Sequence, residues 1–176
     1  MGKYFGTDGF RGKANDNLTA MHAFEVGRFL GWYYGRGQKA RVVVGKDTCR
    51  SSHMLKYALC AGFTASGADA YLLYVTTTPS VSYVTRTDGV DCGVMISASH
   101  NPFYDNGIKL MNREGEKMDD ATSNLVEAYL DGKLEMDGRA WKELPLAQEE
   151  QVGVVVDYSS GRNRYIGYLI GARLAM

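Results

Sequence analysis

The chain has 176 residues, 45% hydrophobic and 23% charged, which is enough for one domain with a hydrophobic core and too few for a second full domain. Its 20 basic and 20 acidic residues cancel, so no global field attracts nucleic acid or a membrane surface, and any anion site must be local. No run of residues approaches the length of a membrane span, and the three cysteines without CxxC spacing are typical of a reducing compartment, so we expect a cytoplasmic protein that binds neither nucleic acid nor a membrane.

Helix and strand patterns alternate along the chain after a glycine-rich N-terminal segment. The first predicted helix runs from 20 to 34, after Thr19, whose hydroxyl can cap it. The later predicted elements are, in order, strand 40–44, helix 52–66, strand 70–75, helix 79–86, strand 92–96, strand 108–111, helix 120–130 and a helical stretch around 165–169. Strands separated by single helices pair in parallel through right-handed crossovers, so the predicted fold is α/β.

Polar loops follow three of the predicted strands, at 45–52, 76–80 and 97–100. Parallel strands bring these loops to one edge of the sheet, where open α/β sheets bind their ligands. The cationic side chains expected at this edge are Lys46, Arg50, His100 and Lys109. Together with helix N-termini they favour an anion and predict a phosphate ligand. Helix capping alone explains the hydroxyl residues of 76–80, and a solvated loop lysine is an equal explanation for Lys46.

The most informative loop is 97–107, SASHNPFYDNG, which follows a buried strand. Asp105, Asn106 and Gly107 predict a turn that returns the next strand beside the loop and brings Lys109 close to Ser99.

A serine among cations at a strand end predicts a phosphoryl carrier. A nucleophile and base pair is disfavoured, because Ser99 and His100 point in opposite directions if the segment is extended, and no GxSxG elbow is present. On the same extended segment Ser97 and Ser99 face one side, so the residues alone leave the choice between these two serines open. The histidines His22, His53 and His100 are too scattered to predict a metal site, and packing or surface roles are expected for the first two.

The run 96–109 closely resembles the phosphoserine loop of the α-D-phosphohexomutase family, in its amino-sugar branch. Residues 4–12, YFGTDGFRG, resemble that family's opening segment, and 44–48, VGKDT, resemble its next loop. The three motifs occur in order and with matching spacing, so the resemblance covers the whole chain. The residues Ala98 and 103–105 separate the loop from the phosphomannomutase and phosphoglucomutase branch.

The resemblance implies a phosphoserine-bearing domain over 1–158, with a mixed, mainly parallel sheet and helices on both faces. Residues 159–176 would be a helical lead toward a second domain that this chain lacks. The implied activity interconverts glucosamine 6-phosphate and glucosamine 1-phosphate through a phosphoserine and a 1,6-bisphosphate intermediate, in the synthesis of bacterial cell-wall precursors. Mg²⁺ is the implied cofactor and would be bound through the phosphate of Ser99.

The resemblance also implies the roles of individual residues. Ser99 would be the phosphoserine, Lys109 a general acid and base assisted by His100, and Arg11 a catalytic residue that holds phosphate charge. The implied phosphate-binding residues are Arg11, Lys46, Asn101 and Lys109. An ion pair with Asp8 is the structural alternative for Arg11.

Two features depart from the family pattern. Cys49 stands where the family loop usually has an arginine, and Arg50 follows on a different face. Family members also continue into further domains that supply a metal-binding loop, a sugar-recognition loop and a distal phosphate-binding loop. Two alternatives remain: a phosphoglucomutase or phosphomannomutase, and a stand-alone module that binds a phosphosugar or a partner without turnover. The surface left open toward the missing domains would also permit a homo-oligomer.

Overall fold

The computed structural model describes residues 2–174. Met1, in the expected domain 1–158, and Ala175 and Met176, in the expected helical lead 159–176, lie outside the described residues. The helices are α1 (Ala20–Tyr34), α2 (Ser51–Ala65), α3 (Thr78–Thr87), α4 (Asp120–Leu130), α5 (Ser159–Leu174) and the short 3-10 helix η1 (Glu149–Gln151). The strands are β1 (Phe5–Gly6), β2 (Gly9–Lys13), β3 (Arg41–Lys46), β4 (Asp69–Val75), β5 (Cys92–Ile96), β6 (Asp105–Met111), β7 (Leu134–Met136), β8 (Arg139–Trp141) and β9 (Val155–Asp157).

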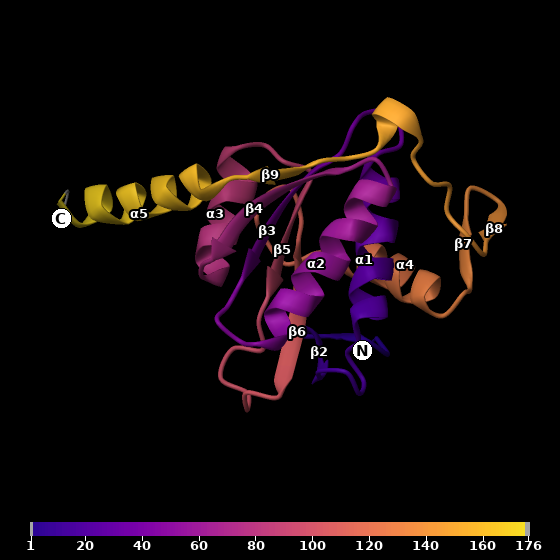
Figure 1. Ribbon diagram of the computed structural model, residues 1–176, viewed down its shortest axis with the longest axis horizontal. Helices are drawn as coiled ribbons and strands as arrows, with labels where there is room; N and C mark the ends of the chain where they lie inside the picture. The colour runs from indigo at the N-terminus through magenta and orange to yellow at the C-terminus, as the bar shows by residue number, and fades with distance from the viewer. Residues whose placement is uncertain (1, 175–176) are drawn as a thin grey trace.

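The main sheet has seven strands in the order β1-β2-β6-β5-β3-β4-β9. Strands β5, β3, β4 and β9 run parallel. On the other side of β5, β6 pairs antiparallel with β5, and β2 pairs antiparallel with β6. Helices α1, α2 and α4 lie on one face of this sheet, and α3 lies on the other (Figure 1). The predicted fold class, a mixed α/β sheet with helices on both faces, is therefore confirmed.

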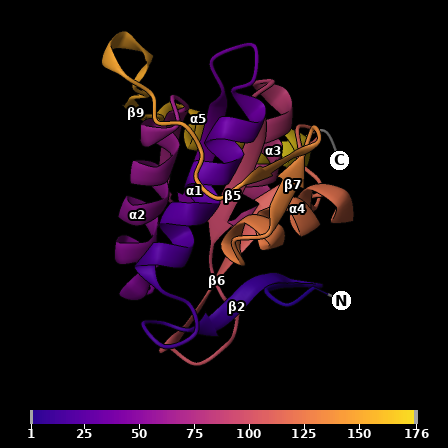
Figure 2. The ribbon, with the colours of Figure 1, turned by 90° about the vertical axis from the view of Figure 1, so that its right-hand side faces the viewer.

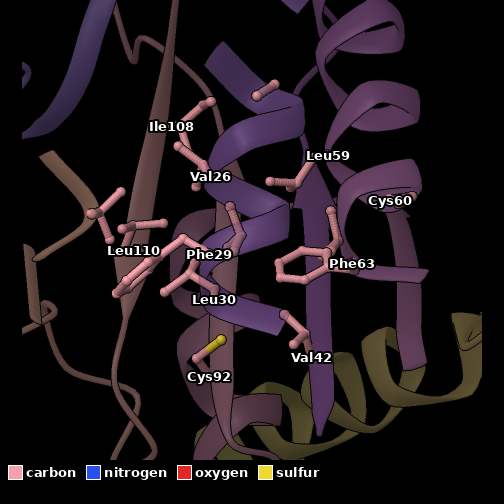
Figure 3. Close-up of a cluster of buried hydrophobic side chains, with 14 of the residues drawn as sticks. Val26, Phe29, Leu30, Val42, Leu59, Cys60, Phe63, Cys92, Ile108 and Leu110 are labelled. Atoms are coloured by element: carbon pink, nitrogen blue, oxygen red, sulfur yellow. The ribbon is translucent and has the colours of Figure 1, made fainter. Parts of the chain in front are cut away.

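Each face of the sheet has its own hydrophobic core, because successive strand residues point to opposite faces. In β3, Val42 and Val44 pack toward α1 and α2, whereas Val43 packs toward α3. Side chains drawn in the larger core include Val26, Phe29, Leu30, Val42, Leu59, Phe63, Cys92, Ile108 and Leu110 (Figure 3). Burial on both faces explains why β3 and β5 are nearly continuous runs of apolar residues.

Helices α1 and α2 cross at two glycines, which lets their backbones approach closely. A Cβ atom on Gly62 would lie 2.1 Å from the carbonyl oxygen of Phe24, and one on Gly27 would lie 2.3 Å from that of Leu59. Any larger side chain at either position would push the helices apart. The crossing fixes α2 against the sheet and thereby places the first turn of α2 at the carboxyl end of β3.

The predicted elements are confirmed, with one error. The bounds observed for α1, β5 and α4 are those predicted, and the hydroxyl of Thr19 caps α1 by accepting from the backbone N–H of His22. The predicted turn at 105–107 is wrong, because these residues form the first part of β6 and pair with 11–13 of β2. That pairing between segments far apart in the sequence outweighs the local preference of Asp-Asn-Gly for a turn.

Helix α5 confirms the helical stretch expected around 165–169. It projects from the rest of the domain (Figure 1) and contacts α3 through stacked rings of Tyr83 and Tyr168, whose centroids lie 4.9 Å apart. Its role as a lead toward a second domain stays a prediction. None of the helices in 2–174 is long and apolar enough to cross a membrane.

Asp119 caps α4, and its removal is expected to weaken the domain measurably. The Asp119 carboxylate accepts the backbone N–H of Thr122 at 2.7 Å and the Thr122 hydroxyl at 2.9 Å, and the backbone bond is the main reason why the pKa of Asp119 lies below its usual value. We expect Asp119→Ala to lower the free energy of unfolding in urea by about 1 kcal/mol at neutral pH, and Asp119→Asn, which keeps a capping oxygen, to lower it less.

The pH dependence of this cap has a definite sign. A carboxyl group whose pKa is depressed by folding stabilises the protein above its ordinary pKa, and this contribution disappears as the pH falls through the depressed value. The wild type and Asp119→Ala should therefore converge in stability in acid. Equal stability of the two proteins at neutral pH would contradict the capping role.

Candidate active site

The loop between β5 and β6 places in different environments the two serines that residue types alone could not distinguish. Ser97 is 7% exposed, and its backbone N–H donates to the carbonyl oxygen of Gly107 at 2.8 Å. The Ser97 hydroxyl accepts the backbone N–H of Ser99 at 3.1 Å, whereas the Ser99 side chain is exposed. The Ser99 backbone has φ 63°, in the left-handed region. This turn breaks the extended segment, so the prediction that both serines face the same side is wrong.

The same turn brings Ser99 and His100 together. The Ser99 Oγ atom lies 3.3 Å from Nδ1 of His100, although the two side chains were predicted to point in opposite directions. Both side chains are exposed at the carboxyl edge of the sheet. An imidazole at this distance can accept a proton from the hydroxyl or donate one to it.

Arg11 reaches the same loop from β2, where it pairs with Gly107 of β6. Its Nη1 atom donates to the side-chain carbonyl of Asn101 at 3.1 Å. Its Nη2 atom lies 3.4 Å from the Asp8 carboxylate, so the ion pair weighed as the alternative is present. The Nε atom of Arg11 is buried and has no hydrogen-bond partner in 2–174. The guanidinium therefore touches the Ser99 loop and keeps one donor that nothing in the described chain satisfies.

Lys109 lies on β6 two residues after Gly107, and therefore on the same face of the sheet as Arg11. Its partner on β5 is Met95, which packs toward α3. Lys109 lines a cavity of about 820 Å³ whose other walls include the loop 7–9 and the start of α3 at 78–79. No hydrogen bond joins Lys109 to Ser99 among the described residues. Lys109 lies on β6, whereas Ser99 lies in the loop that follows β5 and is not among the residues that line this cavity.

Lys46 is separated from this group. It ends β3 opposite Ile96, which packs toward α2, and so lies on the other face of the sheet from Lys109. The Lys46 side chain is 3% exposed, its Nζ atom donates to the carbonyl oxygen of Asp47 at 3.0 Å, and it lies 3.5 Å from Nε2 of His53. The alternative of a solvated loop lysine is therefore wrong.

Asn106 is a buried anchor of the site that sequence reasoning missed. It is 0% exposed, and its side-chain amide donates to the hydroxyls of Ser51 at 2.8 Å and Ser52 at 2.9 Å. The Ser52 hydroxyl in turn donates to the Asp47 carboxylate. The network ties the first turn of α2 to β6, just before Lys109. Extending the alternation of Ile108 and Leu110 back by one step would have placed Asn106 on the buried face.

Cys49 does not replace the charge of the arginine found in the family pattern. Burial is the main reason why the pKa of its thiol is raised, and the neighbouring carboxylate of Asp47 adds to the effect. The thiol is thus neutral near pH 7. Arg50 is exposed at the N-terminus of α2, so any cationic contact in this loop falls to Lys46 or Arg50.

Comparisons with known proteins identify the family to which this fold belongs. The family model "Phosphoglucomutase/phosphomannomutase, alpha/beta/alpha domain I" matches residues 2–136. A phosphoglucosamine mutase of Lachnospira eligens is 64% identical over 173 residues, which are 97% of this chain and 37% of that relative. Another, of Lachnoclostridium phytofermentans, is 62% identical over 170 residues, with 97% and 36% covered. The chain thus spans little more than a third of the length of the curated relatives it matches.

A solved structure shows the same fold. The phosphoglucomutase/phosphomannomutase family protein from Burkholderia thailandensis superimposes with a TM-score of 0.73 at 24% identity, over 96% of this chain and 35% of that chain. The expected resemblance to the phosphohexomutases is confirmed by both sequence and fold. The chain belongs to the phosphoglucomutase/phosphomannomutase family, of which it forms the α/β/α domain I.

Proposed function

We propose that this chain is the phosphoserine domain of a phosphoglucosamine mutase that interconverts glucosamine 6-phosphate and glucosamine 1-phosphate. The observation that carries the proposal is the exposed, left-handed Ser99 at the carboxyl end of β5, in a chain 64% identical to a phosphoglucosamine mutase. Because the chain covers 37% of that relative, the activity is assigned to a longer protein that contains it.

The proposed reaction starts from phosphorylated Ser99. The bond between phosphorus and Ser99 Oγ breaks as the C1 oxygen of glucosamine 6-phosphate bonds to the phosphorus, and the C1 hydroxyl gives its proton to a base. The product, glucosamine 1,6-bisphosphate, reorients in the site so that its C6 phosphate faces Ser99. The bond between phosphorus and the C6 oxygen then breaks as Ser99 Oγ bonds to the phosphorus, and the C6 oxygen takes up the proton held by the base, which leaves glucosamine 1-phosphate and phosphorylated Ser99. Phosphoryl transfer of this kind depends chiefly on positioning and on stabilisation of charge.

In this proposal Lys109 is the general acid and base, with His100 assisting at the serine oxygen. Support comes from the position of Lys109 in the wall of the 820 Å³ cavity and from the 3.3 Å contact between His100 and Ser99. Acid and base catalysis requires a group within reach of the transferred proton once substrate is bound, and contacts that are long in a free enzyme tighten in the complex.

Arg11 is proposed to hold phosphate charge, since a guanidinium matches phosphate geometry. Its unpartnered, buried Nε donor and its contact with Asn101 support this role. Asn101 would bind phosphate beside it. Lys46 would act from the other face of the sheet by its charge, since its ammonium contacts a backbone carbonyl and an imidazole but no carboxylate in 2–174.

The proposal includes Mg²⁺, which would bind an oxygen of the Ser99 phosphate and balance its charge. Mg²⁺ demands near-octahedral oxygen ligands. Residues 2–174 contain no group of three or more His, Cys, Asp or Glu side chains placed to hold a metal ion. The described residues alone do not fit the ion, and its remaining ligands are assigned to the longer protein. A cytoplasmic location is proposed with it, since the three cysteines are free thiols.

An activity assay tests the proposal. We expect the longer protein to convert glucosamine 6-phosphate in preference to the phosphates of glucose and mannose. The 176-residue chain alone should fold and show no turnover, even with Mg²⁺ and a bisphosphate primer, because most of the substrate contacts would be missing. A preference of the longer protein for glucose phosphate or mannose phosphate would instead identify it as a phosphoglucomutase or a phosphomannomutase. Phosphosugar binding without turnover by the longer protein would favour the stand-alone binding module.

A further inference from the structure

One carboxylate of α4 binds three consecutive backbone amides at the N-terminal end of the chain. The Oε1 atom of Glu127 accepts the N–H groups of Tyr4 at 2.9 Å and Phe5 at 2.6 Å, and Oε2 accepts that of Lys3 at 2.8 Å. The N-terminal segment runs beside α4 in the view of Figure 2. Hydrogen bonds to an ionised acceptor are roughly twice as strong as those between neutral groups.

Asp131 and Gly2 complete this contact. Asp131 lies one helical turn after Glu127 and accepts the hydroxyl of Tyr4 at 2.8 Å and the ammonium of Lys3. A Cβ atom at Gly2 would lie 2.1 Å from Oε1 of Glu127, so a side chain at residue 2 would require the end of the Glu127 side chain to shift. We call Glu127 and Asp131 the α4 clamp.

Besides the α4 clamp, this segment is held by its pairing with β2 and by the rings of Tyr4 and Phe5, which pack against the larger core beside Phe10. Strand β1 is an edge of the main sheet and, within residues 2–174, pairs only with β2, through Phe5 with Phe10 and Gly6 with Gly9. Strand β2 pairs in addition with β6 and is therefore fixed independently. The loop 7–9 connects β1 to β2, lines the same cavity as Lys109, and carries Asp8, the ion-pair partner of Arg11. Release of β1 would thus free one wall of the cavity.

We propose that Glu127 is a positioning residue: by binding the amides of residues 3–5 it seats β1 and the loop 7–9 as a wall of the cavity that Lys109 lines. Glu127 itself borders that cavity from α4. Its effect on catalysis rests on the proposed function, whereas its effect on the N-terminal segment does not. The assignment requires two separable consequences, a local loosening of residues 3–5 and a weaker hold on the substrate.

Hydrogen exchange of the 176-residue chain measures the first consequence. In Glu127→Gln an amide NH₂ replaces one of the accepting oxygens, and in Gly2→Ala the new methyl group displaces the carboxylate while leaving its charge. Both variants should exchange the amides of residues 3–5 roughly ten- to hundredfold faster, the factor expected for loss of charge-assisted bonds. Amides of β3 should be unchanged, and Glu143→Gln, at an exposed carboxylate of the surface, should behave as wild type.

Kinetics of the longer protein measure the second consequence. Glu127→Gln should raise KM for glucosamine 6-phosphate roughly tenfold and change kcat less than about threefold, as expected when binding common to the ground and transition states is lost. Unchanged exchange at residues 3–5 in both variants would overturn the clamp, and an unchanged KM with faster exchange would reduce Glu127 to a structural role. If the wild type does not turn over this substrate, the proposed function fails, and the exchange result still decides whether Glu127 seats the segment.

Discussion

Ser99→Ala in the longer protein is expected to lower turnover of glucosamine 6-phosphate by at least about 10⁴-fold, because the transferred phosphoryl group loses the oxygen that carries it. The chain should also lose any covalently bound phosphate. Formation of glucosamine 1-phosphate measures the first effect, and the mass of the intact protein measures the second. Folding should be unaffected, since the Ser99 side chain is exposed.

Ser97→Ala is the matched control for this prediction. Ser97 is 7% exposed, and its hydroxyl supports the backbone of Ser99. We therefore expect the variant to keep its phosphate and to lose far less turnover than Ser99→Ala. The reverse result, with phosphate kept in Ser99→Ala and lost in Ser97→Ala, would show that Ser97 and not Ser99 carries the phosphoryl group.

Lys109→Met is expected to lower kcat of the longer protein by roughly 10²- to 10⁴-fold, the usual range for a general acid or base. Methionine keeps the length and the apolar stem of lysine, and Lys109 is only half-buried in the cavity wall, so stability should change little. Initial rates at saturating substrate measure the effect.

Lys117→Met provides the comparison, because Lys117 lines the same cavity but is exposed and lies beyond the end of β6. It should retain most of its turnover. If both variants lose activity equally, the loss reflects the charge of the cavity and not a proton transfer by Lys109. Near-normal turnover by Lys109→Met would remove this residue from the mechanism.

The elements that the sequence predicted well carry their signals locally. Helix α1 begins at the Thr19 cap, α4 begins at the Asp119 cap, and β5 is a run of apolar residues that is buried throughout. The strand predicted at 108–111 is shorter than β6, because Asp105, Asn106 and Gly107 have a local preference for a turn. Their pairing with β2 overrides that preference. The contacts that decide this lie more than 90 positions apart in the sequence.

Contacts between residues far apart in the sequence determine the conformation of the candidate site more strongly than they determine the overall fold. The left-handed backbone of Ser99 is supported by the hydroxyl of Ser97, which β6 holds through the carbonyl of Gly107. Lys46 is buried at the end of β3, where its ammonium lies 3.5 Å from the imidazole of His53 on α2. Residue types and the family resemblance named the candidate side chains. The packed sheet adds the physical difference between exposed Ser99 and buried Ser97, and it places Lys109 and Lys46 on opposite faces.

Labelling of the longer protein with glucosamine 1,6-bisphosphate that carries radioactive phosphate tests the proposed phosphoserine most directly. After digestion, the label should be found on Ser99 alone, and the labelled protein should pass it to unlabelled glucosamine 6-phosphate. Label on Ser97 or on a threonine, or label on Ser99 that is never transferred to the sugar, would contradict the phosphoryl-carrier role of Ser99.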